Sequence, residues 1–117
     1  MPLSKEICAA YTEILREELL VAMGCTEPIA IAYAASILRT TLEAEPTAIS
    51  AKLSGNIIKN VKSVIVPATG GLHGIAPAIA AGIIANAPEK ELAVLTVLGP
   101  EDREKIQWKN AQKLLGL

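Results

Sequence analysis

The hydrophobic and polar positions near the N-terminus recur with the period of an α-helix. Apolar side chains return every three or four residues, at Ile7, Tyr11, Ile14, Leu15, Leu19 and Ala22. This spacing places them on one face of a helix. Ser4 is a typical residue at the start of a helix, and Gly24 is typical of its end. The pattern therefore predicts an amphipathic helix between these two residues.

A second helix is predicted from Glu27 or Pro28 to about Leu42. Its residues are apolar on nearly every side as far as Tyr33, and the next charge comes only at Arg39. A helix without a polar face is usually surrounded by other parts of the protein. We expect this helix to be buried along most of its length.

Two short segments have the pattern of β-strands. Residues 48–54, "AISAKLS", alternate strictly between apolar and polar side chains, which is the period of a half-buried strand. Residues 63–67, "SVIVP", have the composition of a more deeply buried strand. The sequence thus predicts a small sheet.

The intervening "GNIIKNV" fits either a hairpin turn or a single helical turn. The helical turn is favoured because it separates polar from apolar side chains. It would expose Asn56, Lys59 and Asn60 and turn Ile57, Ile58 and Val61 inward.

The second half of the chain predicts further helices. Ile75–Ala85 is a third, apolar helix, and Pro88 followed by two glutamates is typical of the first turn of a short fourth one. The following "LAVLTVL" also suits a strand, since Val and Thr favour extended backbone. A last amphipathic helix opens at Pro100. It brings Trp108, Ala111 and Leu115 onto one face.

These elements predict an α+β fold, mostly helical, with the helices packed on a small sheet. The 117 residues and the 51% hydrophobic content suffice for a single domain over residues 1–117. Eleven basic against twelve acidic residues give a net charge of -1, so the chain has no basic field for a phosphate backbone. We expect no nucleic-acid partner.

A long uncharged stretch runs from Ser63 to Pro88. Proline and glycine interrupt it, and the continuous apolar piece, about 76–85, is shorter than the roughly 20 residues of a membrane-spanning helix. We expect a buried helix and no membrane partner. Two cysteines are too few for a disulfide framework, and the N-terminus lacks an apolar signal segment. These features predict a cytoplasmic protein with reduced thiols.

Cys25 precedes the second predicted helix. Free N–H groups and the dipole at a helix start favour a thiolate, which suits a nucleophile, a redox thiol or a metal ligand. The alternative is a small buried residue in a tight connection between helices. Cys8 is too distant in sequence for a CxxC pair. A nucleophilic pair with His73 is conceivable, but a histidine in the glycine-rich "GGLHG" is more simply a solvated loop residue.

Three motifs together resemble a known family. They are "GCTEP" (24–28), "LSGNIIKNVKSV" (53–64) and "VPATGGLHG" (66–74). In this order they are similar to the N-terminal part of the L-cysteine desulfidase family, which is related to the alpha part of iron-sulfur L-serine dehydratases. The resemblance implies an oxygen-sensitive lyase that eliminates hydrogen sulfide from L-cysteine, leaving pyruvate and ammonia, or acts on L-serine.

The resemblance also implies a cofactor. In such enzymes three cysteines hold a 4Fe-4S cluster, whose fourth iron stays open for the substrate. Cys25 matches the first ligand, and the other two lie far downstream in family members, which are several times longer. The chain would then be an N-terminal fragment of the catalytic domain that binds no cluster alone. Its expected partners are an amino-acid substrate and either further copies of itself or a missing C-terminal portion.

The other two motifs suggest half of a pocket for that substrate, whose carboxylate needs N–H donors or a cation. The candidate substrate-binding residues are Asn56, Asn60, Thr69, Gly70 and Gly71, and the candidate catalytic residue is Lys59. A purely structural interpretation has the asparagines capping turns and the glycines supplying positive φ. The rival hypothesis for the whole chain is a non-catalytic helical module that docks onto a partner, with Cys25 structural.

Overall fold

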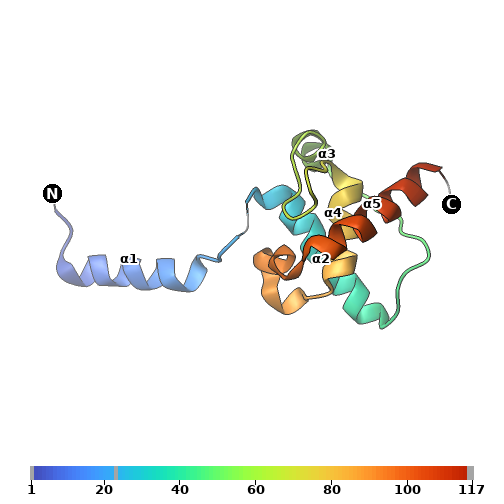
Figure 1. Cartoon of the computed structure of the whole chain (residues 1–117). Coiled ribbons are helices and arrows are strands. Elements are labelled where there is room, and N and C mark those ends of the chain that lie inside the picture. The colour runs from blue at the N-terminus through green and yellow to red at the C-terminus, as the bar shows by residue number, and fades with distance from the viewer. Residues whose placement is uncertain (1, 23, 116–117) are drawn as a thin grey trace.

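Helices make up the regular structure of this chain. The computed structural model describes residues 2–22 and 24–115, with residues 109–115 described by their backbone alone. The helices are α1 (Lys5–Glu18), α2 (Thr26–Leu42), α3 (Gly55–Val61), α4 (Ile75–Ala85), the 3-10 helix η1 (Pro88–Val97) and α5 (Pro100–Leu115). α4 packs against α2, η1 and α5, and α3 contacts α2, while α1 projects away from this bundle (Figure 1).

The predicted sheet is absent from the described residues, so the α+β class is wrong and the described fold is all-helical. Residues 48–54 form an irregular connection, and residues 63–67 contribute one isolated antiparallel bridge, from Ile65 to His73. The helical turn preferred for the intervening motif is confirmed as α3. It replaces the hairpin that would have paired the two segments.

The second half of the bundle confirms the helical alternative for the segment after Pro88. η1 is a 3-10 helix with a break at Glu91, where φ is 50° and ψ is -121°. Val94 and Leu95 are adjacent and both fully buried. A strand would point neighbouring side chains to opposite faces, which is why the strand alternative for this segment is wrong.

α2 and α4 approach each other so closely that only small residues fit between them. Gly82 of α4 faces α2, and a Cβ atom added there would lie 2.1 Å from the carbonyl oxygen of Ala32. Ala78 and Ala81 beside it are also fully buried. The core is built mainly from Ala, Ile, Leu and Val; its largest fully buried apolar side chains include Ile29, Val61, Val66, Val94, Leu95 and Ile106.

α2 is buried along only part of its length. Its buried residues end at Ser36, whose hydroxyl accepts a 2.7 Å hydrogen bond from the N–H group of Ala87. Beyond that point Ile37 and Leu38 are exposed. The predicted burial along most of the helix therefore holds for its first half.

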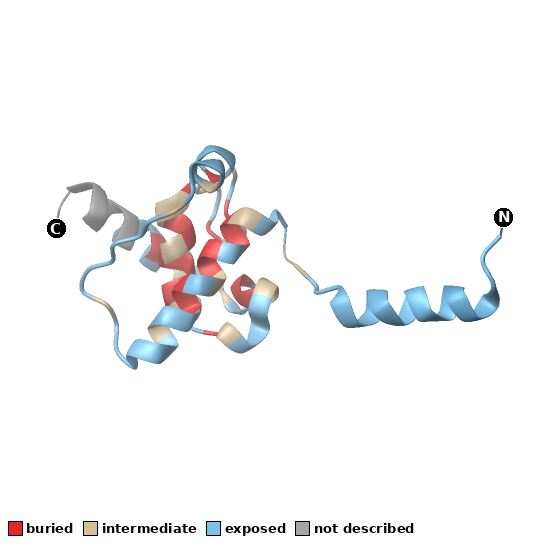
Figure 2. Cartoon of the chain, turned by 180° about the vertical axis from the view of Figure 1, so that it is seen from behind, coloured by how far each residue is buried: buried red, intermediate tan, exposed pale blue. Residues whose placement is uncertain are grey.

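α1 lies outside the core. Ser4 caps it as predicted, with its hydroxyl accepting from the N–H group of Ile7. All residues of Lys5–Glu18 are described and none is buried (Figure 2). The helix ends at Glu18 rather than near Gly24, since Leu19 is already extended. With α1 projecting outward, the radius of gyration is 17.2 Å, against about 13 Å for a compact chain of this length.

The two remaining predictions concern the apolar stretch and the last helix. Within the described residues, no helix is long and apolar enough to cross a membrane, in agreement with a buried helix at α4. α5 begins at Pro100 as predicted. Trp108 is exposed, and the side chains of Ala111 and Leu115, expected on the same face, lie outside the described part.

Candidate functional site

Cys25 stands at the entrance of α2 as an exposed, free thiol. It occupies the N-cap position, but its side chain makes no capping bond. Instead, Sγ donates a 3.3 Å hydrogen bond to Oε2 of Glu27. The interpretation of Cys25 as a buried packing residue is therefore wrong for this chain.

Glu27 is held as a carboxylate by its surroundings. Hydrogen bonds from its own backbone N–H group and from the Cys25 thiol are the main causes that lower the pKa of Glu27; burial opposes them, and a weaker hydrogen bond from Thr26 adds to them. A lowered pKa keeps the side chain ionised and able to accept hydrogen bonds. The start of α2 thus pairs an exposed thiol with a carboxylate.

The buried side chain of Thr69 joins the two sides of the loop 66–74 through hydrogen bonds. The Thr69 side chain is fully buried, and its hydroxyl donates to the carbonyl of Val66 at 2.7 Å and accepts from the N–H group of Leu72 at 3.2 Å. Gly70 and Gly71 follow with φ values of 75° and 100°. These values belong to the left-handed region, so the structural interpretation of the two glycines is confirmed.

The three sequence motifs meet at one end of the bundle (Figure 1). Gly24 lies against the loop: a Cβ atom added to it would be 3.2 Å from Cγ of Pro67. The loop is tied to the segment after α3, where the N–H group of Gly74 donates to the carbonyl of Val64 at 3.3 Å. The entrance of α2, the loop and the end of α3 therefore form one continuous surface.

The predicted residues of α3 lie on its outer side. Asn56, Lys59 and Asn60 are exposed, and among the described residues their side chains make no hydrogen bond or ion pair. Ile57 and Val61 pack inward as predicted, whereas Ile58 is 44% exposed. The structure gives these three polar side chains free donors, but no contact joins them to Gly70 or Gly71.

Two residues of this surface were missed by the sequence interpretation. Glu27 was taken only as a helix start, although its position two residues after a cysteine could have signalled a partner. Arg103 of α5 reaches the loop, and its Cδ atom lies 3.5 Å from the place of a Cβ at Gly70. Nothing in the local sequence links Arg103 to the loop, because some thirty residues separate them.

This surface offers a metal ion one thiol, that of Cys25. Among the described residues, no three His, Cys, Asp or Glu side chains gather in a group that could hold a metal ion. Cys8 lies on the projecting α1, and His73 is exposed in the loop. The described part of the chain therefore supplies one cysteine of the three that the resemblance implies, and a cluster would need ligands from outside it.

Comparisons with known proteins identify relatives of this all-helical segment. It is 53% identical over 97 residues to a UPF0597 protein of Desulfitobacterium hafniense, and 52% identical over 95 residues to one of Treponema denticola. A UPF0597 protein of Shewanella baltica is 46% identical over 97 residues. No family model matches the chain, and no solved structure matches it.

The chain corresponds to a part of these relatives. The matched residues cover 83% of this chain but only 23% of the D. hafniense protein, and 81% and 22% in the T. denticola comparison. The chain thus spans less than a quarter of the length of the curated relatives it matches. Their shared name states no activity, cofactor or substrate.

Proposed function

We propose that this chain is the N-terminal portion of an iron-sulfur lyase that catalyses β-elimination from L-cysteine or L-serine. One observation carries the proposal: the exposed Cys25 thiol stands at a surface where the three motifs of the desulfidase resemblance meet. A surface loop next to a helix start, with an accessible thiol, is a suitable place for a ligand. The relatives' greater length leaves room for the remaining ligands.

Cys25 is the proposed first cluster ligand in the longer protein. A cluster bound there supplies a Lewis-acidic iron for the substrate. A cysteine must lose its proton to act as a ligand. Oε2 of Glu27 accepts the hydrogen bond of the thiol at 3.3 Å and is proposed to orient Sγ, while the proton itself is lost to the solvent.

The loop and its neighbours are the proposed binding surface for the substrate carboxylate. Gly70 and Gly71 present backbone at the surface, and Arg103 adds a cation beside Gly70. Asn56, Asn60 and the proposed catalytic Lys59 extend this polar surface along α3. Thr69 contributes indirectly, by fixing the loop. Such chemistry requires reduced thiols, so we assign the protein to the cytoplasm.

The experiment that tests this function replaces the matched 97 residues of the D. hafniense relative with those of this chain. The chimaera is purified without oxygen and incubated with L-cysteine and with L-serine. We expect pyruvate from at least one substrate, with sulfide in the case of cysteine. Cys25→Ala should abolish this activity, and Arg103→Gln should raise KM more than it lowers kcat.

The same experiment distinguishes the lyase proposal from the rival hypothesis of a non-catalytic docking module. If the chimaera folds and neither amino acid yields pyruvate or sulfide, the lyase proposal is wrong. If the chimaera is active and Cys25→Ala does not reduce its activity, the proposed reaction stands and the proposed role of Cys25 is wrong. A folded chimaera without either product would leave the non-catalytic docking module as the remaining hypothesis.

A further inference from the structure

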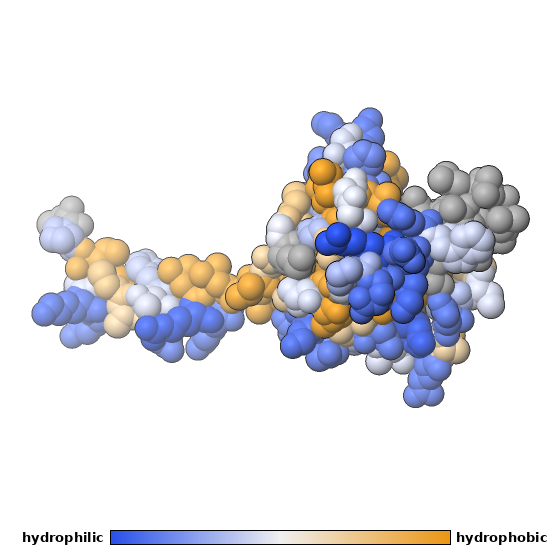
Figure 3. All heavy atoms as spheres, viewed as in Figure 1, coloured by the Kyte–Doolittle hydropathy of each residue, from blue (hydrophilic) through white to orange (hydrophobic). Residues whose placement is uncertain are grey.

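The apolar face of α1 is the largest unpartnered feature of the described chain. Its exposed side chains are Leu3, Ile7, Tyr11, Ile14 and Leu15, followed by Leu19, Leu20 and Val21 in the linker. Figure 3 shows them as an apolar stripe along one side of the helix and its linker, opposite a hydrophilic side. A helix of 14 residues is marginally stable in water without packing. α1 therefore requires a partner for this face.

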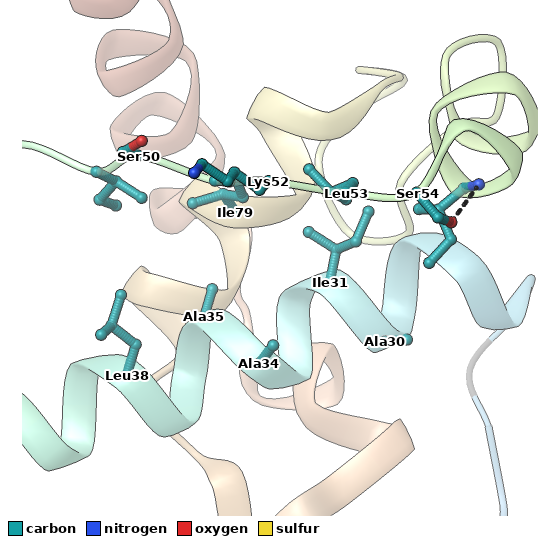
Figure 4. A pocket seen from close by; sticks show the side chains of 13 residues that line it. Ala30, Ile31, Ala34, Ala35, Leu38, Ser50, Lys52, Leu53, Ser54 and Ile79 are labelled. Carbon is teal, nitrogen blue, oxygen red and sulfur yellow. Dashed lines mark hydrogen bonds between the residues drawn. The ribbon is translucent and has the colours of Figure 1, made fainter.

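A groove that suits such a helix runs along the outer side of α2. Its volume is about 430 Å³. Ala30, Ala34 and Leu38 form one apolar side, spaced four residues apart, and residues 49–54 form the other. In Figure 4 the α2 side chains point toward that segment, with Ile79 of α4 behind it.

The two surfaces differ in the size of their side chains. The groove has small alanines at one end, which leave room for large side chains, and α1 offers large aliphatic and aromatic ones. An amphipathic helix lying with its apolar face in a hydrophobic groove is a recurrent mode of recognition.

The charges are complementary as well. α1 carries four glutamates against Lys5 and Arg16, and is therefore net acidic. Lys52 is the charged residue among those that line the groove. An acidic helix beside this lysine gains affinity and orientation.

The path of the chain points to a second copy as the occupant. The linker enters α2 through Gly24, which is packed against Pro67, and α1 continues outward along the 63 Å axis of the molecule (Figure 1). Exchange with a second copy buries the face of α1 while keeping this exit direction. Each copy offers one helix and one groove, so a reciprocal exchange between two copies fills both grooves and leaves no helix unpaired.

We propose that α1 of one copy binds in the α2 groove of a second copy, forming a helix-exchanged dimer. Ile14 lies on the apolar face of α1 and Leu38 lines one end of the groove; they are 52% and 44% exposed, so the substitutions Ile14→Asp and Leu38→Asp leave the core intact. Ala9→Asp is the matched control, because Ala9 is exposed on the opposite side of α1.

The experiment is light scattering of the full chain at about 100 µM, well above the dissociation constant of a sizeable apolar interface. We expect the wild-type chain and Ala9→Asp to be dimers. Ile14→Asp and Leu38→Asp should each raise the dissociation constant at least about 10-fold. Mixing these two variants should restore a one-to-one dimer, since the intact helix of one meets the intact groove of the other.

Each alternative arrangement has its own result. A monomeric wild-type chain overturns the proposal in favour of α1 folding back onto its own groove. If Leu38→Asp stays dimeric, α1 pairs with α1 and the groove is not used. If Ile14→Asp stays dimeric, α1 is not part of the interface. Recovery of the dimer on mixing also proves that both variants are folded.

Discussion

At the scale of single residues, Thr69 was predicted to bind the substrate, but its contacts indicate a structural role. Its hydroxyl is fully buried and already bonded to Val66 and Leu72 on the two sides of the loop. Replacing Thr69 by Val keeps the shape but leaves those backbone groups without their partner, so we expect a loss of about 1–3 kcal/mol in the free energy of unfolding. Urea denaturation measures this, with Thr69→Ser as the control that keeps the hydroxyl. Equal stability of Thr69→Val and the wild type would contradict the structural role.

Glu27 gives a prediction about pH. Its pKa is lowered in the folded chain by its backbone hydrogen bond and by the Cys25 thiol. A carboxylate with a lowered pKa stabilises the fold above its unfolded value of about 4.5, and this contribution disappears as the pH falls through the folded value. Glu27→Gln should therefore lose more stability relative to the wild type at pH 7 than at about pH 4, which lies below the unfolded value. Urea midpoints at the two pH values test this; a difference unchanged by pH would refute it.

Some residues of the candidate site could be predicted from the sequence and others could not. Cys25 was predicted at a helix start because capping and proline signals are local. The same holds for the turn glycines Gly70 and Gly71. The approach of Arg103 to the loop and the contact of Gly24 with Pro67 arise from packing between distant segments. No local pattern encodes such contacts.

At the scale of elements, the contact of α2 with α4 is the tightest in the bundle. Alanine at position 82 would gain about 1 kcal/mol of helix propensity over glycine. Its Cβ would, however, lie 2.1 Å from the carbonyl oxygen of Ala32, a backbone atom that cannot move aside alone. Overpacking of this kind costs about 1–3 kcal/mol or more, so Gly82→Ala should lower the stability.

Thermal unfolding followed by circular dichroism tests this prediction. Gly55→Ala is the matched control, because an added Cβ at Gly55, at the start of α3, meets no atom within 4 Å. That variant should be as stable as the wild type or slightly more so. If Gly82→Ala behaves like Gly55→Ala, the two helices do not approach as closely as described.

The elements also show why the helices were predictable and the sheet was not. A period of three to four residues predicts a helix, whose hydrogen bonds lie inside one segment, and α1 and the start of α5 follow it. A period of two shows only that one side of a segment faces apolar surface. Residues 49–54, of which only Leu53 is half-buried, line the groove beside α2, and among the described residues no strand pairs with the segment. Alternation alone cannot supply a partner strand.

At the scale of the whole molecule, the chain is one core with an appendage. A single cluster of buried residues joins α2, α3, α4, η1 and α5, and no residue of the fully described α1 belongs to it. The sequence predicted α1 from its amphipathic period, which does not say whether the helix packs on the core of its own chain. An apolar stripe indicates that a helix face packs against another surface, but it does not identify the molecule that provides this surface. A second copy is the cover that we propose.

The proposed cofactor gives the last prediction, which concerns the whole chain. A 4Fe-4S cluster is held by cysteine thiolates, and in this chain Cys8 on α1 and Cys25 at the start of α2 are free and exposed. We expect the chain alone, reconstituted with iron and sulfide without oxygen, to retain no cluster through gel filtration, as judged by absorbance near about 400 nm, the usual region of such clusters. The chimaera with the D. hafniense relative should retain one and lose it in Cys25→Ser.

The control for this prediction is the stability of Cys25→Ser. Since the thiol is exposed, the substitution should change the free energy of unfolding by less than about 0.5 kcal/mol, so that a lost cluster cannot be attributed to unfolding. A cluster retained by the chain alone would contradict the assignment of one ligand per chain. If Cys25→Ser then abolished it while Cys8→Ser did not, several copies would be sharing their Cys25 thiolates around one cluster.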